Sequence, residues 1–216
     1  MVNKANRNPV LSEAAVHNYL AFLSDEECYL NLSGNYNYLE WPYYVSQDME
    51  NDRRKVIPSC REMLDAYVTP VFLEKAKLNG LAVPGFYITN GYFEPPVIVD
   101  TVNPFMHRTS IVLKAGHQER VAKSLTRNFT YSVCCQEIPP DSQIKYFRSV
   151  LGWSISRRFR ESSAKFWEVF RIPLAYIRVI IDGEGRILLS NIMPFQFHRL
   201  NAREHAYLKE RIVWRT

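Results

Sequence analysis

The sequence lacks the hydrophobic runs that mark membrane-spanning or secreted proteins. Its 216 residues contain no apolar stretch approaching the ~20 residues that a bilayer span requires. The amino-terminal stretch MVNKANRNPVLSEAA has no apolar core of a secretory signal. The four cysteines form no CxxC pair and no zinc-binding spacing with histidine. We therefore expect a cytoplasmic protein that does not bind membranes.

Short motifs of common enzyme classes are also missing. The chain has no GxSxG, no Walker A sequence and no GxGxxG, and its five histidines lack metal-binding spacing. These absences exclude the usual serine-hydrolase, P-loop and dinucleotide-binding sites.

Hydrophobic residues, by contrast, are plentiful. They make up 47% of the chain and aromatic residues 13%, which is enough for a well-packed core. The net charge is only +5, and arginines gather in SISRRFRESS and near the carboxyl end. We see no helix-turn-helix, zinc finger or aromatic ribonucleoprotein signature, so we do not expect nucleic acid as the main partner. The arginines form either a solvated face or a local phosphate pocket.

Helical and strand patterns alternate along the chain. The spacing predicts a helix over 13–23 and another beginning at the N-cap Ser59, with a junction at Pro70. The run DGEG predicts a hairpin over 174–191, and Gly152 suggests a second hairpin over 146–159. The interleaved order indicates a mixed α/β (α+β) protein.

Several segments, read in order, resemble the RimK-like group of ATP-grasp carboxylate–amine ligases. The similarity covers roughly residues 56–197 and rests on the order of its parts: VIPSCREMLDAYVTPVFLEKAKLNGLAVPGFYI, PPVIVDTVNPF, TSIVLKAGHQERVAKSL, YSVCCQEIPP, KYFRSVLGW and SAKFWEVFRIPLAYIRVIIDGEGRILLSNIMPF. The resemblance implies an ATP-grasp-like fold with two small mixed sheets and flanking helices.

A narrower resemblance concerns the amino-terminal domain that precedes an ATP-grasp module in RimK-like proteins. The stretches NLSGNYNYLEWPYYVSQDMENDRRKVIPS and SVLGWSISRRFRESSAKFWEVFRIPL are similar to it. We accordingly divide the chain into a disordered tail (1–11), a pre-ATP-grasp-like α/β part (12–79) and degenerate ATP-grasp-like lobes (80–216).

The resemblance places unusual residues at the positions that would serve ATP and magnesium. The three metal-ligand positions fall at Arg178, Asn191 and Met193, and the phosphate-binding lysine falls at Asp100. Guanidinium and thioether groups do not bind Mg²⁺. Independently of any family, no carboxylate occurs between Arg186 and Leu200. We therefore expect no catalytic residue, no metal and no cofactor.

Other positions keep the character that the resemblance implies. Gln136 and Glu137 match the hinge that would contact an adenine, and Arg148, Arg157 and Arg158 match basic positions of the family. We expect these residues, with Arg178, to be candidates for nucleotide or anion binding through bidentate contacts. The alternative is that the arginines pair on the surface with the acidic residues Glu161, Asp182 and Glu184.

Three functions remain open from the sequence. The first is a non-catalytic accessory or recognition subunit of a peptide- or amide-bond-forming system, with a ligase or other protein subunit as partner and a peptide or acidic small molecule as further ligand. The second is an active ligase that uses ATP and Mg through relocated ligands such as Glu137 and Asp182. The third is a small basic nucleic-acid-binding protein. The aromatic segment 36–44 either fills the core or forms a contact surface.

Overall fold

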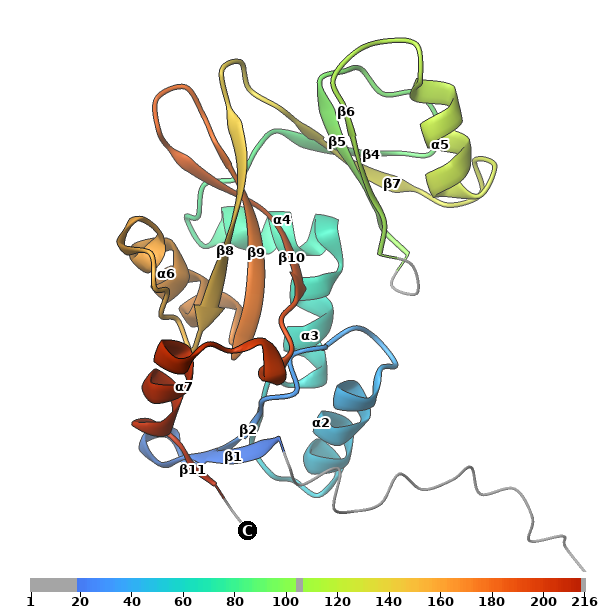
Figure 1. Ribbon diagram of the computed structural model, residues 1–216. Helices are drawn as coiled ribbons and strands as arrows, with labels where there is room; N and C mark the ends of the chain where they lie inside the picture. The colour runs from blue at the N-terminus through green and yellow to red at the C-terminus, as the bar shows by residue number, and fades with distance from the viewer. Residues whose placement is uncertain (1–18, 104–106, 215–216) are drawn as a thin grey trace, which may run out of the picture.

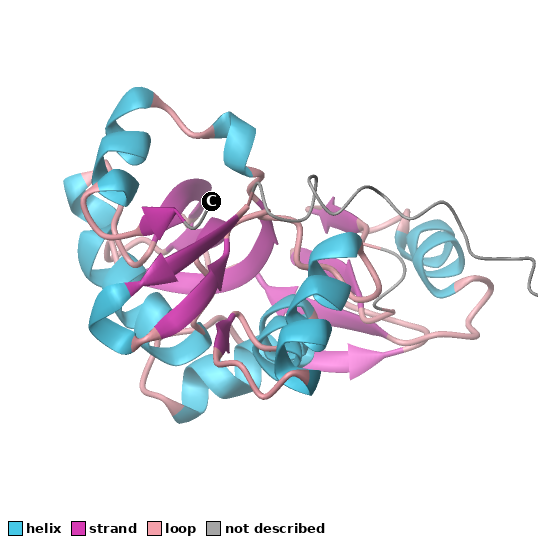
Figure 2. Cartoon of the chain, turned by 90° about the horizontal axis from the view of Figure 1, so that it is seen from below, coloured by secondary structure: helices cyan, strands magenta, loops and turns pink. Residues whose placement is uncertain are grey.

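Three small sheets with flanking helices make up the protein (Figure 1). The structure is a computed structural model and describes residues 19–103 and 107–214. The predicted tail 1–11 and most of the predicted helix over 13–23 lie outside the described residues. Seen from below, the strands lie in the middle of the molecule with helices around them (Figure 2).

The terminal sheet joins the two ends of the described chain. It consists of β1 (Leu20–Leu23), β2 (Cys28–Asn31), β3 (Val56–Ile57) and β11 (Val213–Trp214), in the order β11-β1-β2-β3. The prediction of a helix through residue 23 is therefore wrong for its last four residues. Ala21 and Leu23 point inward with the period of two that a strand requires, and β1 pairs on both edges.

Three helices follow the first strands. They are α2 (Trp41–Asn51), α3 (Cys60–Tyr67) and α4 (Thr69–Leu78). The capping box at Ser59 is confirmed, because the Ser59 hydroxyl accepts from the Glu62 N–H and the Glu62 carboxylate accepts from the Ser59 N–H. The junction at Pro70 is confirmed as well, since α4 begins with proline in its first turn.

The aromatic segment 36–44 divides between core and surface. Tyr36 is fully buried and its hydroxyl donates to the carbonyl oxygen of Asn31 at 2.6 Å. Trp41 and Tyr44, on α2, are each about two-fifths exposed. Trp41 and Tyr44 share the outer face of α2, because residues three apart lie on one face of a helix, whereas Tyr36 precedes the helix and packs in the core.

The upper sheet of Figure 1 is antiparallel. Its strands β4 (Phe86–Thr89), β5 (Val97–Thr101), β6 (Thr109–Val112) and β7 (Val133–Glu137) lie in the order β4-β7-β5-β6. Helix α5 (Gln118–Thr126) covers one face, where Val97, Val99 and Leu125 pack together. The opposite face is turned toward the central sheet.

The central sheet contains β8 (Gln143–Val150), β9 (Leu174–Ile181) and β10 (Ile187–Pro194), in the order β10-β9-β8. The hairpin around DGEG is confirmed as β9–β10. The predicted hairpin over 146–159 is wrong: β8 pairs with β9 along one edge, and on its other edge only an isolated bridge joins Val150 and Trp153. The segment Arg157–Phe159 is instead a 3-10 turn, η2, that leads into α6 (Arg160–Phe170).

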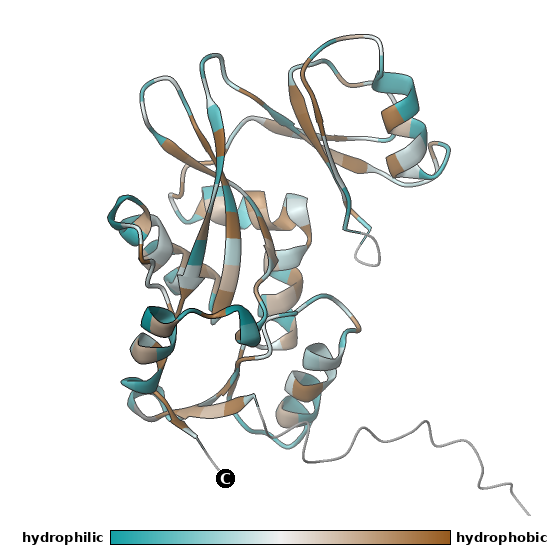
Figure 3. Ribbon diagram, in the orientation of Figure 1, coloured by the Kyte–Doolittle hydropathy of each residue, from teal (hydrophilic) through white to brown (hydrophobic). Residues whose placement is uncertain are grey.

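One hydrophobic core joins the terminal and central sheets, with contributions from both ends of the chain. Figure 3 shows hydrophobic residues along these strands. After β10, the turn η3 (Phe197–Arg199) and α7 (Ala202–Lys209) lead back to β11. The mixed α/β class is confirmed. The described strands form three sheets rather than two, and only the terminal sheet is mixed. The division of the chain at residue 79 stays a prediction.

No helix of the described ranges has the length and apolar character needed to cross a bilayer.

Candidate functional site

A buried ion pair between Asp100 and Arg178 connects the upper and central sheets. The Arg178 guanidinium bonds both oxygens of the carboxylate, with Nη2–Oδ2 at 2.5 Å and Nη1–Oδ1 at 3.2 Å. Both side chains are only 2% exposed. The contact is bidentate, which is the strongest form of charge-assisted hydrogen bond in proteins.

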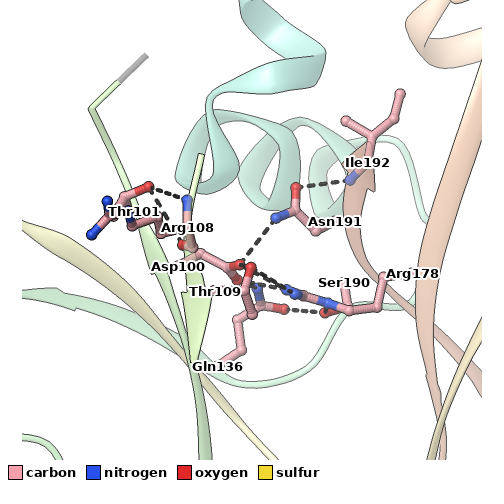
Figure 4. Close-up of polar contacts among 9 residues, drawn as sticks. All are labelled: Asp100, Thr101, Arg108, Thr109, Gln136, Arg178, Ser190, Asn191 and Ile192. Atoms are coloured by element: carbon pink, nitrogen blue, oxygen red, sulfur yellow. Dashed lines mark hydrogen bonds and ion pairs between the residues drawn. The ribbon is translucent and has the colours of Figure 1, made fainter. Parts of the chain in front are cut away.

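Four polar side chains complete the environment of this pair (Figure 4). Asp100 also accepts from the Thr109 hydroxyl at 2.5 Å, from the Gln136 amide at 2.7 Å and from the Asn191 amide at 3.1 Å. The Arg178 Nε donates to Ser190 Oγ at 2.9 Å, and Ser190 in turn donates to Gln136 Oε1 at 2.8 Å. We call these six residues the Asp100 network. Their mutual hydrogen bonds offset the free-energy cost of burying polar and charged groups.

Strand register explains how the upper sheet contributes its half of the Asp100 network. In β5 and β7, Asp100 lies opposite Cys134 and Ile98 lies opposite Gln136. Asp100 and Gln136 therefore share the face that looks toward the central sheet, two residues apart along the ladder. Thr109 lies opposite Asp100 on β6 and joins the same face.

A β-bulge explains the contribution of β10. The pairing of β9 with β10 shifts between Leu189 and Asn191, so Ser190 has no partner residue in the ladder. Successive residues of a regular strand point to opposite faces. Because of the bulge, Ser190 and Asn191 both reach the Asp100 network although they are neighbours in the sequence.

Two thiols next to the Asp100 network, those of Cys134 and Cys135, are unreactive at neutral pH. Burial, together with the Asp100 carboxylate, raises the pKa of the Cys134 thiol well above its ordinary value. Burial also raises the pKa of Cys135, to about 11. Both thiols are protonated at neutral pH, so neither is a nucleophile there.

We expect these thiols and the other two cysteines to resist modification in the folded protein. Cys28 is buried, and burial with the nearby Glu50 carboxylate raises the pKa of Cys60 to about 12. Ellman's reagent at pH 8 should label about one thiol or fewer in native protein and all four after denaturation, because the reacting species is the thiolate. Rapid labelling of two or more native thiols would contradict this burial.

The residues at the implied metal positions do not fit magnesium. Mg²⁺ prefers carboxylate and water oxygens in octahedral geometry. Arg178 supplies only donors, Met193 a soft sulfur, and the Asn191 amide already bonds Asp100. Among the residues that the structure describes, no group of three or more His, Cys, Asp or Glu side chains could hold a metal ion.

The relocated ligands considered from the sequence are Asp182 and Glu137, and Asp182 has another role. Asp182 caps the β9–β10 turn, where it accepts from the Arg186 side chain at 2.6 Å and from the backbone N–H of Glu184 at 3.0 Å. Glu137 is exposed at the end of β7. The hinge candidate Gln136 is fully buried and uses both ends of its amide inside the Asp100 network.

The arginines predicted as candidates for anion binding do not lie together in one site. Arg178 joins Asp100, whereas Arg148 lies 3.5 Å from the buried Glu204 carboxylate and over the Phe195 ring. Arg157 and Arg158 are exposed on η2. The alternative surface pairing is not observed in the described residues either: Glu161 pairs with Lys165, and Asp182 and Glu184 with Arg186. Sequence reasoning missed Thr109, which no motif marks, and Glu204, which the capping-box spacing from Asn201 could have indicated.

Comparison with solved structures shows that the chain has an ATP-grasp-like fold. A RimK domain ATP-grasp protein from Sphaerobacter thermophilus DSM 20745 matches with a TM-score of 0.56 and 11% identity over 77% of this chain. The ATP-grasp ligase PsnB, complexed with minimal precursor, Mg and ADP, matches with a TM-score of 0.52 and 16% identity over 77%. An L-amino acid ligase from Bacillus licheniformis matches with a TM-score of 0.51 and 11% identity over 70%.

This chain spans 71%, 65% and 45% of the length of those three chains, respectively. No family model matches the sequence. No curated protein matches it either. The fold is therefore shared with known ligases, while the identities of 11–16% leave the activity to be argued from the site.

Proposed function

We propose that this protein is a non-catalytic, ATP-grasp-like accessory or recognition subunit of a system that forms peptide or amide bonds. The observation that carries the proposal is the buried pair of Asp100 and Arg178. The family resemblance assigns a lysine to position 100 and a metal-binding carboxylate to position 178. This chain carries the opposite charge at both positions, and the exchanged charges bind each other.

Such an exchange of charges supports the view that this chain has lost ATP-dependent catalysis, rather than carrying it out with other residues. An ATP-grasp ligase must neutralise a triphosphate with cations and a basic side chain. Here the basic group at this place is already neutralised by Asp100, and Asp100 has four hydrogen-bonding partners of its own. Opening the site for a nucleotide would separate the two buried charges and leave the Asp100 carboxylate buried without a counter-charge, which is strongly unfavourable.

The partners in this proposal are a ligase subunit and a peptide or acidic small molecule. Support comes from the fold, since the similar ligase PsnB is seen in complex with a minimal precursor. An ATP-grasp-like scaffold that no longer handles nucleotide could keep a role in recognising a partner. The proposal includes a cytoplasmic location, which the four free thiols favour.

Nucleotide binding tests the non-catalytic part of the proposal. A site with a Kd near 10 μM would add about 2.7 kcal/mol at ~1 mM Mg-ATP and raise Tm by several degrees. We expect no shift with Mg-ATP, Mg-ADP or ATP plus EDTA, while a catalytically active ATP-grasp ligase in the same assay should shift. A saturable, magnesium-dependent rise in the Tm of this protein would overturn the proposal.

The accessory role is tested separately. The chain should form a stoichiometric complex when it is co-expressed with an ATP-grasp ligase encoded beside it, as measured by size-exclusion chromatography with light scattering. It should also change the rate or the substrate range of that ligase. A ligase that neither binds the chain nor responds to it would remove the accessory role and leave the nucleotide result unaffected.

A further inference from the structure

The excess positive charge of the chain is concentrated in two segments. Residues 148–160 and 199–211 together contain eight of the 27 Lys and Arg residues but only two of the 22 Asp and Glu residues. The rest of the chain therefore has one more acidic than basic residue. A charge excess this localised creates a directional field at the surface rather than a general property of the protein.

Tertiary structure brings the two segments together through a four-membered stack. The Trp153 and Tyr207 rings are stacked with centroids 4.7 Å apart and planes at 13°. The Arg211 guanidinium lies 3.5 Å from the Tyr207 ring centroid, and that of Arg160 lies 6.0 Å from the Trp153 centroid. The ion pair of Arg148 with Glu204 adds a second link between the segments. We call the surface of η2, the start of α6 and α7 the basic face.

Four cations of the basic face are available to a partner. Arg157, Arg158, Arg203 and Lys209 are exposed, and none of them forms an ion pair within the described part of the chain. Glu204, one of the two acidic residues, is only 2% exposed and already paired with Arg148. The basic face therefore favours a polyanionic ligand.

The aromatic stack argues against a nucleic acid as that ligand. Proteins that bind single strands present open aromatic faces on which bases stack. Here the two rings cover each other on one side, and the Arg211 guanidinium lies against the outer face of Tyr207. The stack therefore leaves at most the outer face of Trp153, near Arg160, on which a base could lie. The basic face offers positive charge, and its arginine guanidinium groups can form bidentate hydrogen bonds with carboxylates.

An apolar pocket lies beside α7 as well, so a ligand that covers this helix should also carry an apolar group. It has a volume of about 620 Å³, and its lining includes Phe197, Ala206, Lys209 and Trp214. Trp214 is 38% exposed, and Figure 3 shows hydrophilic segments on α7 beside this region. Because Lys209 belongs to both the pocket and the basic face, a single ligand that covers α7 meets positive charge and an apolar cavity together.

We infer that the basic face and this pocket form a docking surface for an acidic peptide segment, of a partner protein, that carries an apolar side chain. The inference rests on the proposed accessory role and names the chemistry of its partner. Carboxylates would engage the exposed arginines, and the apolar side chain would enter the pocket beside Trp214 as the anchor of the interface. The surface lies on α7 and η2 and does not involve the Asp100 network.

Fluorescence anisotropy with defined peptides tests this inference. One labelled peptide of about 15 residues is glutamate-rich with a central Leu-Phe pair, and a second has Gly-Gly in place of that pair. We expect R157Q/R158Q/R203Q to weaken binding of the first peptide at least tenfold. The control K77Q/K114Q/K145Q removes the same charge from exposed lysines elsewhere and should change binding less than twofold. Equal weakening by both variants would overturn the inference, because binding would then follow net charge alone.

The pocket is tested with the pair of peptides. The Leu-Phe peptide should bind at least fivefold more tightly than the Gly-Gly peptide, and Trp214→Ala should abolish that difference while circular dichroism shows the protein folded. No difference between the peptides in the wild-type protein would overturn the inference. Tighter binding of a poly-uridine of equal charge would overturn it in favour of nucleic acid. None of these outcomes depends on ATP, so they are distinguishable from failure of the non-catalytic proposal.

Discussion

Replacing Arg178 with methionine is expected to lower the free energy of unfolding by about 3–5 kcal/mol, because it leaves the Asp100 carboxylate buried without its counter-charge. Methionine roughly keeps the length of the side chain, so the loss reports the charge more than the packing. For a chain of this size the Tm should fall by roughly 6–20 °C. Urea unfolding followed by circular dichroism gives the free energy directly.

A double-mutant cycle tests whether the loss of stability comes from breaking the pair of Asp100 and Arg178. Asp100→Asn alone should also be costly, because it leaves the Arg178 guanidinium buried beside a neutral amide. In the double variant D100N/R178M no charge remains in the Asp100 network, and an asparagine at position 100 can keep bonds to Thr109 and Gln136. We expect the double variant to cost at least about 2 kcal/mol less than the sum of the single variants.

An exposed ion pair provides the matched control. Lys165→Met removes a cation from the pair with Glu161, whose side chains are 54% and 81% exposed. Solvent screens this pair, so its loss should leave the unfolding midpoint unchanged within error. R178M could prove as mild as K165M, or the effects of D100N and R178M could simply add. Either result would mean that the Asp100 network is hydrated. We would then have to abandon the proposal that the buried pair excludes nucleotide and metal.

Alanine at position 34 is expected to cost about 2–5 kcal/mol. Gly34 has a φ of +80°, where an L-residue with a Cβ pays ~1–2 kcal/mol. In addition, a Cβ there would lie 2.0 Å from the Phe195 carbonyl oxygen, so the backbone must shift at a further cost of about 1–3 kcal/mol. The Gly34 carbonyl also accepts from the Phe195 N–H at 2.9 Å, directly after β10.

Gly80→Ala separates the two contributions. Gly80 has a φ of +73°, but nothing lies within 4 Å of the position that its Cβ would take. This variant should therefore show only the conformational cost of about 1–2 kcal/mol. Chemical denaturation of both variants checks the comparison. Equal losses for G34A and G80A would mean that the segment around Phe195 yields easily, and that the close approach of residue 34 to the end of β10 is unimportant.

Local patterns were sufficient for many elements of the fold. The capping box at Ser59, the junction at Pro70 and the hairpin around DGEG each depend on residues a few positions apart, so the sequence alone could predict them. The wrong predictions involve partners far along the chain. Residues 20–23 form a strand because β2 and β11 pair with them. The segment after Gly152 leads into α6 instead of a second strand, and Phe166 and Phe170 of α6 pack against Phe72 of α4.

What the sequence determined by itself is an inventory of charges. It showed arginine, asparagine and methionine where the resemblance implies metal ligands, aspartate where it implies lysine, and no carboxylate between Arg186 and Leu200. Tertiary structure decided where those charges go. Asp100 and Arg178 are 78 positions apart, and the bulge that aims both Ser190 and Asn191 at them has no sequence signature. An ion pair depends on two groups meeting in space, and only the packing of one sheet against another brings these two together.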